Sequence, residues 1–333
     1  MSARGATSRA GAAPEKSTST AVSRRTTRRP LTRVRKRQLS QRLHSPKRRR
    51  PRQCARRSPR RLSRGKREAP RAGSFRARAH HAKSAAGDMP RRVFIGTAGW
   101  SVPRAWAHRC PGDGTHLERY SNMFRCAEIN SSFHRPHSAA TYSKWAGCTP
   151  DAFRFAVKIP RTITHDRKLK RARRPLETFL RECAGLGRKR GPILVQLPPS
   201  LSFEARRVRT FFQLIRSFHP GAVICEPRHE TWFAAEADRL MMRFKVARVA
   251  ADPAPAPGGD LPGAWPGIVY YRLHGSPRKY WSKYESRYLE RLAAAIRQVP
   301  ASVDVWCVFD NTASGAALEN AWELRSLFAA ANH

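Results

Sequence analysis

Short apolar stretches alternate with amphipathic stretches along the chain from about Val93 to the C-terminus. The apolar stretches are rich in β-branched and aromatic residues, which is typical of buried strands. This pattern predicts eight strands. They are Val93–Trp100, Cys126–Phe133, Phe153–Ile159, Ile193–Pro199, Val223–His229, Lys245–Asp252, Ile268–Gly275 and Val303–Asn311.

Between most of these strands, apolar residues recur three or four positions apart, which predicts helices that bury one face. The connection after Asp252 differs, because it is rich in Pro and Gly from Pro253 to Gly267, and we expect no helix there. The predicted helices are His116–Phe124, Ala139–Ala146, Leu176–Leu186, Glu204–Phe218, Ala234–Phe244, Tyr284–Val299 and Ala316–Ala330.

Eight strand–helix units over residues 89–333 approach the roughly 250 residues of a βα-barrel. We therefore predict an α/β fold in which these residues form a single (β/α)8 TIM-type barrel. A doubly wound open sheet is the competing architecture. It is disfavoured because no Gly-x-Gly-x-x-Gly motif follows the first strand, and no helix begins directly after Gly96–Gly99.

Positive charge is concentrated in the first quarter of the chain. Residues 1–90 carry 28 Lys and Arg against 3 Asp and Glu, within a formal net charge of +43 for the whole chain. This segment has one Phe and no Trp or Tyr, so it cannot bury enough apolar surface to offset its ordering entropy. We expect residues 1–88 to be a disordered Arg-rich tail. It could be a nucleic-acid-binding arm, an organelle transit peptide, or a segment that native translation omits by starting at Met89.

Other protein classes are disfavoured by composition. No apolar stretch approaches the roughly 20 residues that span a membrane, so no membrane partner is expected. The seven cysteines are scattered without a Cys-x-x-Cys motif, which argues against a zinc ribbon and a disulfide framework. A reducing cytoplasm is the expected location. No cofactor is evident, and no metal site is predicted.

Polar and ionisable residues recur toward the C-terminal end of nearly every predicted strand. Strand side chains alternate between the barrel interior and the helical shell, and the sites of such barrels lie at this end. We therefore predict a polar site there. The side chains expected to point inward are Glu128, Asn130, Lys158, Gln196, Glu226, Arg228, Arg248, Asp252, Tyr270, Arg272 and His274, with Asn311 at the end of the last strand.

Four of these side chains are candidates for catalysis. Glu226 and His274 could transfer protons, with Glu128 as a second carboxylate. Lys158 could form a Schiff base if it is desolvated, although pairing with a barrel carboxylate is the more ordinary role for it.

The remaining candidates are assigned to substrate binding. Arg228 and Arg272 could clamp a carboxylate or phosphate through two hydrogen bonds each, so an anionic or sugar-like small molecule is the expected substrate. Trp100 could be a platform for a ring or a plug that closes the barrel. The other predicted binding residues are Asn130, Gln196, Asn311, His165 and Asp252.

Three alternatives compete with an enzyme site. The charged residues could be a purely structural network, since their signs nearly balance. The barrel region itself has more Lys and Arg than Asp and Glu, so nucleic-acid binding or processing is a second alternative. A metal site is a third, but no local ligand spacing such as His-x-x-x-His supports it.

Short motifs follow one another in order from the first predicted strand to the last. They are Gly96–Ser101, Glu128–Phe133, Phe155–Lys158, Thr164–His165, Gln196–Pro199, Glu226–His229, Arg272–Gly275 and Phe309–Thr312. Together they resemble the family called domain of unknown function 72 (DUF 72). The resemblance implies a TIM barrel without an established reaction. Val102, Pro227 and Asp310 depart from the family's usual residues, and the first two could reshape the rim of the site.

Overall fold

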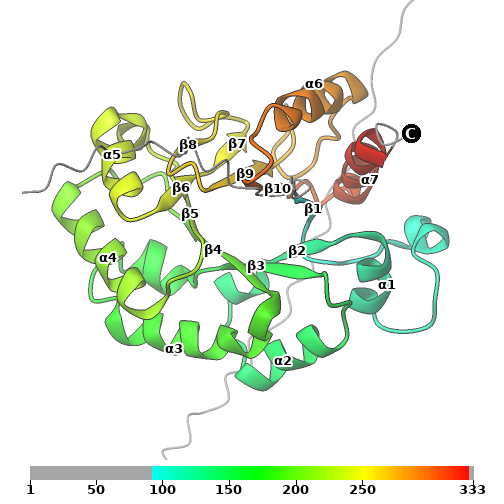
Figure 1. Cartoon of the computed structure of the whole chain (residues 1–333), viewed down its shortest axis with the longest axis horizontal. Helices are drawn as coiled ribbons and strands as arrows, with labels where there is room; N and C mark the ends of the chain where they lie inside the picture. Colours follow the sequence, from blue (N-terminus) through cyan, green and yellow to red (C-terminus); the bar gives the residue numbers. More distant parts are fainter. Residues whose placement is uncertain (1–91, 330–333) are drawn as a thin grey trace, which may run out of the picture. The chain divides into compact units, whose positions relative to one another are not determined.

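The computed structural model describes residues 92–329, shown as the coloured ribbon in Figure 1. The predictions for residues 1–88 lie outside the described residues. One sheet runs in the order β7-β9-β10-β1-β2-β3-β4-β5-β6-β8. The strands are β1 Val93–Ala98, β2 Cys126–Ile129, β3 Arg154–Lys158, β4 Arg190–Gln196, β5 Val223–Glu226, β6 Val246–Arg248, β7 Ala250–Asp252, β8 Gly263–Ala264, β9 Ile268–Leu273 and β10 Asp304–Phe309.

The predicted sixth strand brings the two ends of this sheet together. It is interrupted at Val249 and forms two halves, β6 and β7. β6 pairs in parallel with β5, and β7 pairs in parallel with β9, so the sheet is a nearly closed barrel. The prediction of a (β/α)8 TIM-type barrel is therefore confirmed for the described residues.

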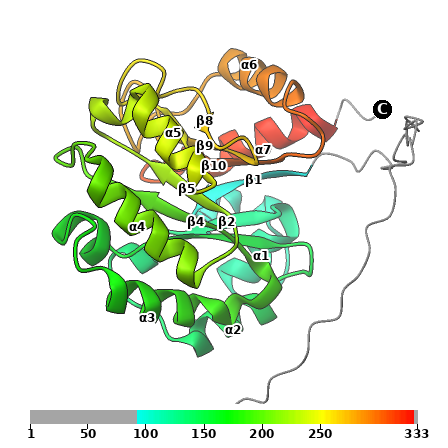
Figure 2. The ribbon, with the colours of Figure 1, turned by 60° about the vertical axis from the view of Figure 1, so that its left-hand side comes forward.

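Helices surround the sheet on its outside, as the two views in Figures 1 and 2 show. As expected, the connection after Asp252 contains no helix, and the two-residue strand β8 lies there instead. The α-helices are α1 His116–Met123, α2 Ala139–Gly147, α3 Arg173–Cys183, α4 Ala205–Phe218, α5 Ala235–Arg243, α6 Ser286–Arg297 and α7 Ala316–Ala329.

Two apolar layers hold the barrel together. The larger one lies between the helices and the outer face of the strands. The smaller one fills the barrel interior with side chains such as Phe94, Leu194, Ile224 and Trp306, which come from opposite sides of the barrel. Because this interior packing lies below the strand ends, the polar side chains near those ends pack against an apolar layer.

Local signals in the sequence fix the helix starts and the close contact of β1 with its neighbour. Thr115 and Glu118 form a reciprocal capping box at α1, and the Ser138 hydroxyl accepts a hydrogen bond from the Thr141 amide at α2. Gly96 on β1 is required by space, since a Cβ there would lie 2.1 Å from the Cys126 carbonyl oxygen.

Several strands end at earlier residues in the structure than the sequence predicts. The predicted second strand stops at Ile129 and continues as the 3-10 turn Ser131–Phe133, and the predicted fifth strand stops at Glu226. Beyond the edge of the barrel a strand has no neighbour to pair with, so the chain turns toward the next helix.

Among residues 92–329, no helix has both the length and the apolar character that crossing a membrane requires.

Candidate functional site

A buried ionic cluster lies at the C-terminal strand ends, centred on Arg272 of β9. The Arg272 side chain is only 1% exposed. Its Nε and Nη2 donate to Glu128 of β2, with Nη2 2.7 Å from Oε1. Its Nη1 donates to Glu226 of β5 at 3.0 Å, and Nη2 lies 2.9 Å from Oδ2 of Asp310. All three guanidinium nitrogens are therefore engaged by protein carboxylates from three different strand ends.

His274 joins two of these carboxylates. Its Nε2 lies 2.8 Å from Glu226 Oε1 and its Nδ1 lies 3.0 Å from Asp310 Oδ2. Arg228 Nη2 lies 2.5 Å from the same Glu226 oxygen and 2.9 Å from His274 Nε2. Both ring nitrogens face carboxylates, and Nε2 also faces the Arg228 guanidinium, so Nε2 would donate to Glu226 but accept from Arg228.

The cations around the carboxylates set their protonation. Burial by itself would raise the pKa of Glu226, but Arg228, Arg272 and His274 outweigh it and hold the pKa well below 4.5. Asp310 is likewise buried, yet Arg272 and His274 lower its pKa below 3.8. Both carboxyl groups are therefore ionised at neutral pH.

We expect Glu226→Gln to flatten the acid limb of the stability curve. The folded pKa of Glu226 is lowered, so its contribution to stability is present above 4.5 and is lost as the pH falls through the folded value. Urea unfolding from about pH 6 down to about pH 2.5 will measure this. The wild-type midpoint should fall more steeply with acid than that of the variant. Glu290→Gln, which removes an exposed carboxylate, should follow the wild type; parallel curves for all three chains would contradict the expectation.

Lys158 of β3 lies beside this cluster but takes no part in its ion pairs. Its residue is 5% exposed, and its Nζ lies 4.1 Å from the centre of the Phe133 ring. Within the described part of the chain, its ammonium group forms no ion pair. Burial, together with the nearby Arg272, lowers the pKa of Lys158 to about 8. About a tenth of this amine is therefore uncharged at pH 7, far more than for an exposed lysine.

Uncommitted polar atoms lie at the ends of the neighbouring strands. Asn130 Oδ1 and Arg228 Nε are buried and have no hydrogen-bond partner among the described residues. Gln196 lies beside Glu226 in the strand register and makes one long bond, 3.5 Å, to the Leu197 carbonyl. These groups are free to bind a polar molecule.

Two segments border the cluster. His165, in the turn Thr162–Asp166 after β3, packs its ring edge against Phe133 with centroids 4.9 Å apart. Burial and the neighbouring Lys158 lower the pKa of His165, so it is mainly neutral. On the other side, the ring of Tyr280 contacts that of His274 with centroids 5.5 Å apart. The segment after β9 therefore covers His274.

Three predicted binding residues lie elsewhere. Trp100 packs edge-on against Trp145 of α2 and against Phe155, in the layer between sheet and helices, so it does not plug the barrel, and its role as a platform stays a prediction. Asn311 donates to the Ser282 carbonyl and to Asn320 of α7, and does not point into the barrel.

The inward direction predicted for the sixth strand is also wrong. Ala247 and Val249 point into the barrel, whereas Arg248 pairs with Asp238 of α5 at 2.9 Å. Asp252 accepts a hydrogen bond from the Tyr284 hydroxyl at 2.7 Å on the outer side. Small apolar residues occupy both faces of this strand. The positions of its polar residues therefore do not indicate which face points into the barrel.

Asp310 is the cluster residue that the sequence interpretation missed. Trp306 and Val308 point into the barrel, and the two-residue alternation continues to Asp310. This alternation indicates that Asp310 points inward, whereas the sequence prediction placed the adjacent Asn311 at the site. Arg272 is not available to clamp an anion as predicted, because its nitrogens already bind carboxylates. Of these two arginines, Arg228 is the one that keeps an unpartnered donor.

In the described part of the chain, no group of three or more His, Cys, Asp and Glu side chains is arranged to hold a metal ion. The His274, Glu226 and Asp310 side chains instead bond to one another and to the two arginines.

Comparison with known proteins gives matches across the barrel. The profile of the family described as "Protein of unknown function DUF72" matches residues 94–333. UPF0759 protein YecE of Escherichia coli (strain K12) is 30% identical over 144 residues, 43% of this chain, which spans half of YecE's length. UPF0759 protein YunF of Bacillus subtilis (strain 168) is 22% identical over 267 residues, covering 71% of this chain and 94% of YunF.

Solved structures agree with the fold. A DUF72 family protein (TM1631) from Thermotoga maritima MSB8 superposes with a TM-score of 0.60 at 23% identity, over 72% of this chain and 100% of that one. A DUF72 family protein (EF0366) from Enterococcus faecalis V583 gives 0.60 at 19% identity, over 72% of this chain and 99% of its own. None of these descriptions supports the nucleic-acid alternative.

Proposed function

The chain belongs to the DUF72 family of proteins of unknown function, and from its ionic cluster we propose that it is an enzyme acting on a small polar carbonyl compound through the amine of Lys158. The observation that carries the proposal is the buried Lys158 ammonium without an ion pair, next to a cluster in which every carboxylate is paired. A lysine is activated as a nucleophile by desolvation or by a neighbouring cation. Lys158 has both, the Phe133 ring and Arg272.

Charge balance in the cluster supports a mobile proton. The carboxylates of Glu128, Glu226 and Asp310 face the guanidinium groups of Arg228 and Arg272. One negative charge is left over. It is balanced when either Lys158 or His274 is protonated, so a proton can leave Lys158 and be held on His274 without an unpaired buried charge.

The proposed chemistry begins with attack of the neutral Lys158 amine on the carbonyl carbon. The C–N bond forms as the carbonyl oxygen takes up a proton, and loss of water gives a protonated imine. The imine withdraws electrons from the adjacent carbon and weakens its bonds to hydrogen or carbon. His274 and Glu226 supply and accept the protons in these steps, and water regenerates the amine at the end.

The groups around Lys158 fit a hydroxylated, anionic substrate. Asn130 and Gln196 offer amide groups to hydroxyls, and the unpartnered Arg228 Nε offers a charged donor to a carboxylate or phosphate. An unpaired buried donor or acceptor costs about 1–3 kcal/mol, which a bound polar molecule would relieve. The substrate class is therefore a small sugar-like or acidic aldehyde or ketone.

Borohydride trapping tests the proposal. The full chain is incubated with hydroxylated and acidic aldehydes and ketones, and borohydride then delivers hydride to the imine carbon to give a stable secondary amine. Peptide mass mapping should find the modification on Lys158. Lys189 is an internal control, because it is also buried but donates to the Ala146 and Thr149 carbonyls at 2.7 and 2.5 Å.

Lys158→Arg extends the test, since it keeps a positive charge without a nucleophilic amine. Trapping and turnover should both be absent in this variant, while its fold is retained. Modification confined to exposed lysines, with Lys158 unmodified across the whole set of carbonyl compounds, would overturn the proposed chemistry.

A further inference from the structure

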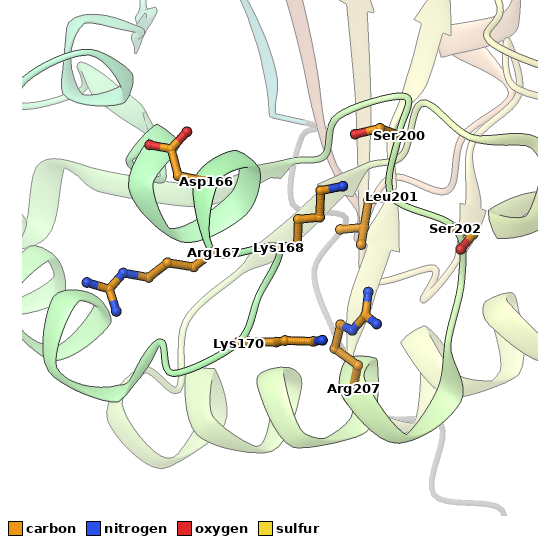
Figure 3. A pocket seen from close by; sticks show the side chains of 8 residues that line it. All are labelled: Asp166, Arg167, Lys168, Lys170, Ser200, Leu201, Ser202 and Arg207. Carbon is orange, nitrogen blue, oxygen red and sulfur yellow. The ribbon is translucent and has the colours of Figure 1, made fainter.

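A strongly basic pocket of about 370 Å³ lies at the same end of the barrel as the ionic cluster. It is formed by the loop that follows β3 and the loop that joins β4 to α4. Figure 3 shows Lys168 and Lys170 extending toward Leu201 and Arg207 across the pocket, whereas Arg167 extends away from it. The hydroxyls of Ser200 and Ser202 also line it.

The two lysines are held in position by a fixed loop. Leu169, between them, is only 5% exposed and is anchored in the apolar layer. Its amide donates to the Ile163 carbonyl at 3.0 Å, and the Lys170 amide donates to the Arg167 carbonyl at 2.9 Å. Lys168 and Leu169 have positive φ values of 46° and 68°, which are unfavourable for residues with a side chain. The fold therefore maintains an unfavourable backbone that presents both ammonium groups at the pocket.

Two of these three cations have no carboxylate partner in the described part of the chain, and the third has one. Lys168 and Lys170 form no ion pair within residues 92–329. The carboxylate of Asp166 is bound by Arg161 at 3.1 Å. Arg207 pairs with Glu204, yet its Nε is buried without a hydrogen-bond partner. Positive charges that line one pocket repel one another unless an anion lies between them.

The start of α4 adds to this field. Arg207 lies in its first turn, after the N-cap residue Glu204, and no side chain caps the free amides of this turn. A helix N-terminus has a partial positive charge, so an arginine there is unfavourable in isolation and favourable beside a bound anion. Arg207, which lines the pocket, thus adds positive potential to that of the two lysines, and the Glu204 carboxylate offsets part of it.

We infer that this pocket binds a phosphate group through Lys168, Lys170 and Arg207. A phosphate has two negative charges and several acceptor oxygens, which match three cations and two serine hydroxyls. The volume exceeds that of the ion itself and leaves room for the remainder of a phosphorylated small molecule. The inference does not depend on the reaction at Lys158, because it concerns binding at a separate set of residues.

Calorimetric titration of the full chain at low ionic strength with inorganic phosphate and with glycerol phosphate tests the inference. Lys168→Ala/Lys170→Ala should weaken phosphate association about tenfold or more, since two charged donors are lost. The matched control is Lys144→Ala/Arg209→Ala, which removes one exposed lysine and one exposed arginine outside the pocket. Its affinity should stay within about twofold of wild type, and binding by the basic N-terminal segment is common to all three chains.

Tighter binding of glycerol phosphate than of inorganic phosphate would identify a phosphorylated small molecule as the ligand. Equal binding would identify free phosphate. Equal loss of affinity in the pocket variant and the control variant would overturn the inference, because it would show attraction by the general basic surface only.

Discussion

Replacing Arg272 by methionine is expected to lower the free energy of unfolding by about 3–5 kcal/mol, the cost of removing one partner of a buried ion pair. Arg272 is bonded to Glu128, Glu226 and Asp310, and the three carboxylates are almost fully buried. Glu226 and Asp310 keep His274 as a partner in the variant. Glu128 keeps only the Tyr270 hydroxyl, at 2.9 Å, and becomes a buried, nearly uncompensated charge.

Thermal and urea unfolding will measure this effect. For a domain of this size, each kcal/mol corresponds to roughly 2–4 °C in Tm, so a fall of about 6–20 °C is expected. Arg92→Met is the matched control, because Arg92 makes a two-point ion pair with Asp304 but its side chain is 65% exposed. Exposed pairs contribute at most about 1 kcal/mol.

A second substitution keeps the prediction testable if Arg272→Met folds poorly. Adding Glu128→Gln removes the stranded charge and should restore more than about 1 kcal/mol, although Glu128→Gln alone should destabilise the wild type. Similar small losses for Arg272→Met and Arg92→Met would show that the cluster is not the electrostatic centre of the barrel.

Lys158→Met is expected to abolish turnover of the carbonyl compound identified by trapping, by about a thousandfold or more, while making the protein more stable. Loss of the amine removes the nucleophile. Stability should rise because the pKa of Lys158 falls from 10.5 to about 8 on folding, which corresponds to a penalty of about 3 kcal/mol at neutral pH. Methionine fills a similar volume without a charge, so a gain of about 1–3 kcal/mol is expected.

The pH dependence of this gain is a direct check. The folded state binds the Lys158 proton more weakly than the unfolded state, so the penalty is complete below about 8 and disappears as the pH rises toward 10.5. The difference in Tm between Lys158→Met and wild type should therefore be largest near pH 7 and smaller near pH 9.5. Comparing the two chains at each pH cancels the titration of the tyrosines and cysteines that both contain.

Lys189→Met is the control for this variant. Lys189 is also buried, but its ammonium donates to the Ala146 and Thr149 carbonyls, and its loss removes the donor that the Thr149 carbonyl has from it. It should therefore destabilise the protein, opposite in sign to Lys158→Met. If both substitutions change stability in the same direction, the contrast between an unpaired and a satisfied buried lysine is wrong.

The barrel and part of its ionic cluster could be predicted from the chain alone. Eight apolar stretches, amphipathic returns and the one non-helical connection after Asp252 identify the fold, because burial of alternate faces leaves a pattern in the residues themselves. The alternation of side chains also predicted that Glu128, Glu226 and Arg272 point into the barrel. These residues are polar positions within strands that are otherwise apolar on both faces. Those residues were predicted as a group, and they do meet.

Other features depended on how neighbouring strands and helices meet in space. Asp252 and Arg248 have partners on the helical side, and Asp310 rather than Asn311 points inward, because strand breaks and partners distant in sequence decide the direction of each polar side chain. The same holds for Lys158. The sequence predicts only that this lysine lies near carboxylates. In the tertiary structure each carboxylate of the ionic cluster pairs with an arginine, and the Lys158 amine lies against the Phe133 ring. A local pattern determines which residues are buried, but pairing among buried charges depends on distances of a few ångströms between strands far apart in the chain.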